Sequence, residues 1–129
     1  METKAPPPLA SGPCRCQQRI RRTLDLIANK WAVPVILELS RAKGPLRFTA
    51  LARAIAGITQ KELTKQLREL EGAGLVTRHV YAVVPPKVEY ALTPLGASLK
   101  PVLDALAGWA SDHGDRIAAN EAAFSGVPT

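Results

Sequence analysis

Five polar side chains that can bind nucleic acid recur along one side of a predicted helix spanning residues 59–71. They are Gln60, Lys61, Thr64, Lys65 and Arg68. With about 3.6 residues per turn, they lie opposite a stripe formed by Leu63, Leu67 and Leu70. Lysine and arginine bind phosphates and guanine acceptors, glutamine pairs with adenine, and threonine contacts phosphate or the thymine methyl group. The alternative is a solvated helix face, and the helix by itself does not decide between the two.

Position along this helix separates the expected roles of the five side chains. The first residues of a recognition helix approach the bases most closely. We therefore expect Gln60, Lys61 and Thr64 nearest the bases, and Lys65 and Arg68 on the phosphate backbone. Base contacts specify a sequence, whereas phosphate contacts strengthen binding to all DNA alike.

The other polar residues of the helix extend this pattern. A second glutamine, Gln66, is a further candidate for pairing with adenine. The acids Glu62, Glu69 and Glu71 are expected at the sides or at the far end of the helix, away from the donors and cations. This segregation of charge favours contact with an anion over a solvated surface.

Basic charge is concentrated in the body of the chain. The formal net charge is +6, and residues 15–100 contain fifteen Lys or Arg against six Asp or Glu, a balance of +9. Residues 101–129 contain one Arg and four acids, a balance of −3. A basic body favours a polyanionic partner, and nucleic acid is the commonest one.

Helical periodicity precedes the polar helix. Apolar residues between positions 19 and 40 recur at spacings of three and four with a plausible break at Asn29, which predicts two helices. Pro34 is compatible only with the first turn of the second helix, where its missing N–H does no harm. A very short strand at residues 47–49 is then expected to lead into a third helix.

A tight turn and a capping box are predicted to start the polar helix. Gly57 stands at the corner, and Thr59 is followed three residues later by Glu62, the spacing of a capping box. Two helices joined by such a turn form a helix-turn-helix pair, whose second helix fits the major groove of DNA.

Alternating apolar residues then predict a β-hairpin over residues 76–92, with Pro85-Pro86-Lys87 at its stiff tip. A hairpin in this place is the wing of a winged helix-turn-helix. The wing and the start of the third helix carry further candidate DNA contacts. They are Arg47, Thr49, Arg78 and Lys87. For Lys87 the alternative is a solvated turn.

A last helix is predicted to begin at Pro94, with Thr93 as its N-cap and a kink at Pro101. Its apolar residues follow alternating spacings of four and three over two heptads. We expect the first and last helices to form a dimer interface, or Trp109 to fold back onto Trp31. The expected interface residues are Ile20, Leu24, Leu99, Val102, Leu106 and Trp109.

These patterns together predict a mainly α fold with a small β-hairpin, an α+β class. The architecture is a winged helix-turn-helix with N- and C-terminal dimerisation helices. One domain is expected over residues 14–114. A disordered arm is expected over residues 1–13, which hold four prolines, and a loosely ordered tail over residues 115–129.

Cys14 and Cys16 form a C-x-C motif among several arginines at the start of the first helix. Cations and a helix N-terminus favour the reactive thiolate form, so a thiol here can respond to oxidants and form an intersubunit disulfide. Two such motifs across a dimer would also supply four thiolates for a metal. The third alternative is a pair of incidental thiols in a reducing cytoplasm.

Enzyme and membrane functions find little support in the sequence. His79 and His113 have no acid or cysteine partner at a diagnostic spacing, and there is no Gly-rich phosphate loop. No apolar run approaches the roughly 20 residues that cross a bilayer, and the first residues lack an apolar signal core. We therefore expect a cytoplasmic protein that is not an enzyme and holds no cofactor.

Several segments resemble the HxlR family of bacterial transcription regulators, winged-helix relatives of the MarR group. They cover most of residues 16–112 and are LDLIANKW (24–31), RF (47–48), GITQKELTKQLRELEGAGLVTRHVY (57–81), VPPKVEYALTPLG (84–96) and LKPVLDALAGWA (99–110). The resemblance implies a homodimer, held by its first and last helices, that binds operator DNA as a repressor or activator.

The resemblance also bears on the cysteines. Some members of the family sense quinones, aldehydes or oxidants through a cysteine near the start of the first helix, usually followed by proline. Here Gln17 follows Cys16. The expected function is a dimeric repressor on an inverted-repeat operator that responds to an oxidant or electrophile. The alternatives are a winged helix used only for protein interaction, and a regulator whose signal is a small apolar ligand.

Overall fold

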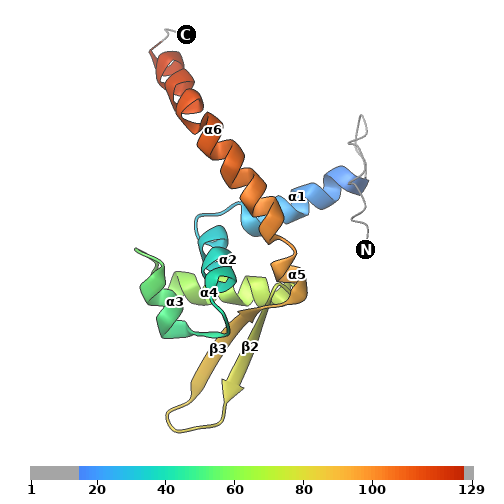
Figure 1. Cartoon of the computed structure of the whole chain (residues 1–129), viewed down its shortest axis with the longest axis vertical. Helices are drawn as coiled ribbons and strands as arrows, with labels where there is room; N and C mark the ends of the chain where they lie inside the picture. Colours follow the sequence, from blue (N-terminus) through green and yellow to red (C-terminus); the bar gives the residue numbers. More distant parts are fainter. Residues whose placement is uncertain (1–14, 127–129) are drawn as a thin grey trace.

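The computed structural model describes residues 15–126 as a mostly helical chain with a small antiparallel sheet. The expected arm over residues 1–13 and Cys14 lie outside this range. The elements are α1 (Arg15–Ile27), α2 (Ala32–Arg41), β1 (Leu46–Arg47), α3 (Phe48–Ala54), α4 (Gln60–Gly72), β2 (Val76–Tyr81), β3 (Lys87–Leu92), α5 (Pro94–Ala97) and α6 (Lys100–Ser125). The predicted fold class is confirmed (Figure 1).

The break at Asn29 is confirmed and has a local cause. The side-chain oxygen of Asn29 accepts hydrogen bonds from the backbone N–H groups of Trp31 (3.1 Å) and Ala32 (2.9 Å). These groups would have no partner within the helix that starts at Ala32, so Asn29 satisfies the backbone donors at the start of α2, whose N-cap residue is Trp31. Pro34 is the third residue of α2, within the first turn as predicted.

The turn between α3 and α4 is built as the sequence predicts. Gly57 has a φ of +83°, a left-handed conformation that side chains other than glycine rarely adopt. Thr59 Oγ1 accepts from Glu62 N–H at 3.0 Å, and Glu62 Oε1 accepts from Thr59 N–H at 3.0 Å. The capping box is therefore complete, and α4 begins at Gln60.

Three strands form the sheet in the order β1-β3-β2. β2 and β3 make the predicted wing, with Val80 opposite Val88 and Val76 opposite Leu92. The short first strand is Leu46–Arg47, which pairs with β3, and not residues 47–49 as predicted. The chain turns into α3 immediately after Arg47, so Thr49 lies in that helix.

The core lies where α2, α3 and α4 meet the sheet. Its largest fully buried side chains are Ile36, Leu51, Leu63, Leu67, Leu70 and Val35. The predicted leucine stripe of α4 is thus confirmed as the buried side of that helix. Burial of these side chains is the main force that fixes α4 on the domain.

The predicted single last helix is wrong in one respect. The chain forms a short helix, α5, and then a separate helix, α6, with Leu99 at the junction. Pro101 is the second residue of α6 and not a kink inside one helix. A proline has no N–H to donate, so it fits the first turn of a new helix better than the middle of an old one.

The predicted loosely ordered tail also differs from the structure, since α6 continues to Ser125. Residues 117–123 read IAANEAA, and alanine has the highest intrinsic helix propensity. Helix propensity therefore sustains a segment that lacks a buried apolar stripe. The second half of α6 stands clear of the rest of the chain (Figure 1).

Gly96 provides a test of the packing of α5 against Leu75, the residue just before β2. A Cβ atom at this position would overlap the backbone carbonyl oxygen of Leu75. We expect Gly96→Ala to lower the free energy of unfolding by about 3 kcal/mol, because backbone must move to relieve the overlap. Denaturant unfolding followed by circular dichroism measures the change.

The matched control is Gly108→Ala, in the middle of α6, where an added Cβ meets nothing within 4 Å. This variant should gain about 0.5–1 kcal/mol because alanine loses less backbone entropy than glycine in a helix. Wild-type stability in Gly96→Ala would contradict the close approach of α5 to Leu75.

Candidate nucleic-acid interface

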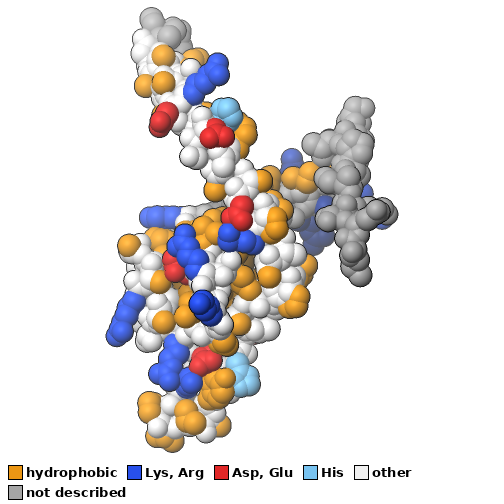
Figure 2. Space-filling model, in the orientation of Figure 1, with side chains coloured by type: hydrophobic (Ala, Val, Ile, Leu, Met, Phe, Trp, Pro, Cys, Tyr) orange, Lys and Arg blue, Asp and Glu red, His pale blue; other side chains and the backbone are white. Residues whose placement is uncertain are grey.

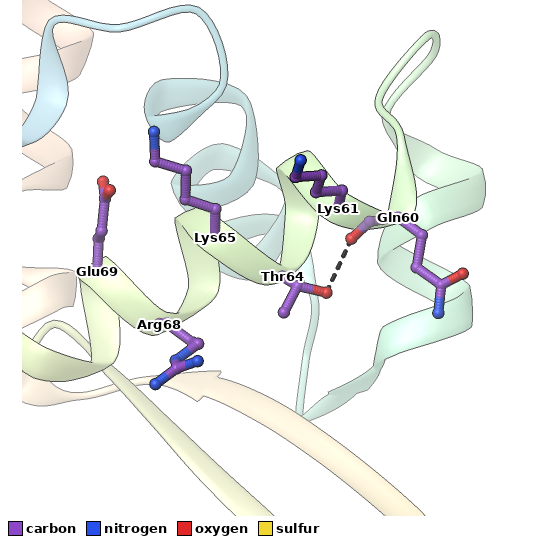
Figure 3. A pocket seen from close by; sticks show the side chains of 6 residues that line it. All are labelled: Gln60, Lys61, Thr64, Lys65, Arg68 and Glu69. Carbon is purple, nitrogen blue, oxygen red and sulfur yellow. Dashed lines mark hydrogen bonds between the residues drawn. The ribbon is translucent and has the colours of Figure 1, made fainter.

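The exposed side of α4 brings together all five polar residues predicted for it. They line a shallow hollow together with one acid: Gln60, Lys61, Thr64, Lys65, Arg68 and Glu69. Lys61, Lys65 and Glu69 project from one side of the helix, and Gln60, Thr64 and Arg68 from the other (Figure 3). The face presents three cations, two uncharged polar groups and one acid to solvent.

The hydroxyl group of Thr64 already donates its one hydrogen bond within the helix. Its Oγ1 donates to the backbone oxygen of Gln60 at 2.8 Å (Figure 3). The hydroxyl proton is therefore directed into the helix, and the oxygen lone pairs and the methyl group remain for a ligand. A thymine methyl or a donor on a base suits this arrangement better than a phosphate does.

Two expectations about the face of α4 are wrong. Gln66 is buried, with its Oε1 unpaired among the described residues, so it does not reach a ligand on the exposed side. Glu69 lines the hollow and does not lie away from the cations. Glu69 follows Lys65 by four residues, about one helical turn, and so projects from the same side of the helix.

The first turn of α4 is held by a carboxylate whose charged form the fold favours. Hydrogen bonding from the Thr59 backbone N–H is the largest cause that lowers the pKa of Glu62, and a hydrogen bond from the Trp31 side chain adds to it. Because the pKa of Glu62 is lowered in the folded chain, its hydrogen bonds stabilise the fold near neutral pH. This stabilisation is lost as the pH falls through the lowered pKa.

The wing and the start of α3 form a second hollow that sequence reasoning did not foresee. It is lined by Arg47, Phe48, Thr49, the wing loop and Lys87. Three of the predicted contact residues therefore line one hollow: Arg47, Thr49 and Lys87. Arg47 and Thr49 are exposed, so their side chains are open to a ligand.

Lys87 does not sit at the tip of the wing as a free cation. It begins β3, its Nζ lies 2.9 Å from Glu89 Oε1 and 4.8 Å from the centre of the Tyr81 ring. The hydrogen bond from Lys87 is the largest cause that lowers the pKa of Glu89. The tip itself is apolar, with the side chain of Val84 fully exposed (Figure 2).

Arg78 is exposed on β2 and pairs in register with the buried Tyr90 of β3. Directly opposed residues in an antiparallel pair project from the same face of the sheet. Arg78 therefore lies on the same face of the sheet as Val76 and Tyr90, which belong to the core. This places its cation on the wing beside the helical body.

The six predicted interface residues lie on α1 and at the start of α6. Five of them are large exposed apolar side chains: Ile20, Leu24, Val102, Leu106 and Trp109. Leu99 is half-buried. Trp109 is 55% exposed and lies against His113 of its own helix, while the Trp31 indole bonds to Glu62. The alternative in which Trp109 folds back onto Trp31 is therefore wrong.

Cys16 carries a free, half-buried thiol. It lines the hollow between α1 and α6 together with Arg15, Arg19 and apolar side chains of both helices. Cys14 lies outside the described residues. Within residues 15–126 no group of three or more His, Cys, Asp or Glu could hold a metal ion.

Sequence reasoning missed the link between Trp31 and Glu62, which joins the α1–α2 turn to the polar helix. The residues are 31 positions apart, and no local pattern connects them.

In the described part of the chain, no helix is both long and apolar enough to span a membrane.

The sequence matches the family model described as HxlR-like helix-turn-helix over residues 26–118. Among similar proteins, the HTH-type transcriptional regulator YtcD of Bacillus subtilis strain 168 is 44% identical over 98 residues, which cover 76% of each chain.

Solved structures of two regulators are also similar to this chain. The redox regulator HypR in its reduced form is 40% identical, with a TM-score of 0.70, over 78% of this chain and 98% of HypR. The diamide-treated form of YodB from B. subtilis is 33% identical, with a TM-score of 0.63, over 73% of this chain and 91% of YodB.

Proposed function

Because the chain belongs to the HxlR-like helix-turn-helix family of transcription regulators, we propose that it binds specific DNA sequences as a homodimer, with α4 in the major groove. The observation that carries this proposal is the exposed face of α4. Three cations, two uncharged polar groups and one acid line one hollow on a helix whose opposite side is fully buried. The major groove of DNA admits such a helix and presents acceptors to it.

The exposed residues of α4 are proposed to reach different depths in the major groove. Gln60, Lys61 and Thr64 belong to the first turns, which approach base edges most closely. Lys65 and Arg68 lie further along and bind the phosphate backbone. Glu69 limits how far the helix can lie against phosphates, because its charge repels them.

The wing provides a second contact with the same DNA. Arg47 and Thr49 face the hollow beside the wing loop, where a phosphate can bind both of them. Lys87 also contacts this DNA, and its ion pair with Glu89 offsets part of its positive charge. Arg78 extends the basic surface along β2. The apolar wing tip lies against sugars and not against phosphates.

A second copy of the chain covers the apolar side chains of α1 and α6. Large exposed apolar residues are concentrated on these helices, and such patches commonly mark protein interfaces. A two-fold dimer presents two copies of α4 about one DNA turn apart and so binds an inverted repeat. We propose that this cytoplasmic dimer acts as a repressor by occupying its operator.

The signal is proposed to be an oxidant or electrophile that acts on the N-terminal cysteines. Cys16 lies beside Arg15 and Arg19, and cations make a neighbouring thiol more reactive. Oxidation joins one thiol from each subunit in a disulfide: two protons and two electrons pass to an oxidant such as diamide, which becomes a hydrazine. The new bond changes the relative positions of the two copies of α1 and, with them, of α4.

A salt titration tests DNA binding. For wild-type protein and a random duplex, log K should fall steeply with log salt concentration, because bound phosphates release counterions. Lys65→Ala or Arg68→Ala should weaken binding to all DNA and reduce the slope by about one unit. Undetectable binding at low salt would contradict the proposal and favour a protein-interaction module.

The same measurement separates base contacts from phosphate contacts. Gln60→Ala or Thr64→Ala should relax sequence preference by ~1–3 kcal/mol per lost base contact, with little effect on random DNA. Equal losses on preferred and random duplexes for Gln60→Ala would show that Gln60 does not contact bases.

Sedimentation equilibrium tests the dimer. Leu106→Glu places a charge in the exposed apolar surface of α6 and should yield a monomer, since an unpaired charge in an interface is costly. Ser111→Glu adds the same charge to the opposite side of α6 and should leave the dimer intact. If Leu106→Glu forms dimers over the same range of protein concentration as the wild-type chain, the interface lies elsewhere.

Diamide treatment tests the cysteines. The wild-type dimer should form a reducible crosslink and change its DNA affinity, and the variant Cys14→Ser with Cys16→Ser should do neither. Each single variant then identifies which thiol is required. A DNA response that survives in the double variant would favour the alternative signal, a small apolar ligand in the hollow between α1 and α6.

A further inference from the structure

One carboxylate connects two turns that are distant in the sequence. The indole Nε1–H of Trp31 donates a hydrogen bond of 2.7 Å to Glu62 Oε2, across 31 residues. The other oxygen, Oε1, accepts from the backbone N–H of Thr59 at 3.0 Å. Glu62 therefore completes the capping box of α4 and at the same time ties α4 to the turn between α1 and α2.

The Trp31 end of this link is itself held in place. Asn29 Oδ1 accepts from the Trp31 backbone N–H at 3.1 Å, and the Trp31 backbone oxygen accepts from Val35 N–H at 3.1 Å. The Lys30 ammonium lies 4.8 Å from the centre of the indole. A Cβ added at Gly57 would be 3.8 Å from the ring, so the indole also covers the turn before α4.

The buried leucines of α4 do not by themselves fix its orientation. Apolar burial is strong but non-directional, so it restrains a small rotation or tilt of the helix less sharply than a directional contact does. A hydrogen bond at the first turn has a preferred length and angle and restrains such movements. Gln60, Lys61 and Thr64 lie within two residues of Glu62, so the link acts where base contacts are proposed.

We infer that Trp31 and Glu62 are positioning residues that orient the first turn of α4 for base recognition. This inference rests on the proposed function of α4. Neither side chain needs to touch DNA, because the link acts through the direction of the helix. Trp31 lies in the turn between α1 and α2 and directly precedes α2, so the link also restrains α4 relative to the proposed dimerisation helix.

Nuclear magnetic resonance of the ¹⁵N-labelled chain tests the hydrogen bond without DNA. The two indole N–H signals belong to Trp31 and Trp109. The Trp31 signal should lie downfield and shift as the pH falls through the lowered pKa of Glu62, with Lys30 as the charged neighbour of that group. Glu62→Gln should abolish this shift, because an amide does not titrate.

A competition experiment tests the positioning role. The probes are a duplex that the wild-type protein selects from a random-sequence pool and a random duplex of equal length. Trp31→Phe removes the indole donor and leaves the capping box in place. It should reduce the ratio of the two affinities roughly tenfold, as the loss of a base contact does, with random-duplex affinity kept within about twofold.

Glu62→Gln is the second variant and Glu71→Gln its matched control. Both remove one negative charge from α4. In wild-type protein Thr59 and Trp31 donate to different oxygens of Glu62, and Glu62→Gln replaces one of these oxygens by an NH₂ group, so one of the two contacts is lost in the present geometry. Glu62→Gln should therefore lower the affinity ratio, and Glu71→Gln should keep the wild-type ratio. If Trp31→Phe does not fold, Glu62→Gln decides the matter.

The outcomes separate the inference from the proposed function. A wild-type affinity ratio in both folded variants would overturn the positioning role alone, as would a Trp31 signal that is insensitive to Glu62→Gln. Parallel loss on both duplexes together with a lower unfolding temperature would show a structural role only, and would overturn it too. Failure of the wild-type protein to bind any duplex would overturn the proposed function, and the inference with it.

Discussion

The arrangement of this protein depends on holding α4 by one side while leaving the other side free. Leu63, Leu67 and Leu70 are essentially buried, and they fix the helix on a core shared by α2, α3 and the sheet. Because a helix presents its side chains on all sides, the residues opposite the leucines are exposed as a consequence.

The start of α4 is held by directional contacts that the leucines do not supply. Gly57 allows the turn before it, and the capping box satisfies backbone N–H groups that have no partner in the helix. Glu62 joins this start to Trp31. Apolar burial therefore supplies most of the free energy, and a few hydrogen bonds set the direction of the helix.

Charge and apolar surface are separate on α4 and mixed on α1. Cations lie on the exposed face of α4 and beside the wing, and Arg15 and Arg19 of α1 line the same hollow as large apolar side chains of α1 and α6. In Figure 2, α6 extends away from the end of the body that lies opposite the wing. The proposed DNA surface on α4 and the proposed interface between copies on α1 and α6 therefore lie on different elements.

The sequence by itself determined the local features. Periodicity and capping residues predicted both helices around Asn29, the start of α4, the hairpin and the side of α4 that Leu63 buries, because these depend on neighbours within a few residues. Tertiary structure decided the rest. It placed Arg47 beside the wing loop, paired Lys87 with Glu89, joined Trp31 to Glu62 and separated Trp109 from Trp31. Except for the short Lys87–Glu89 pair, these depend on how distant segments pack, and packing distances are not encoded in any local spacing.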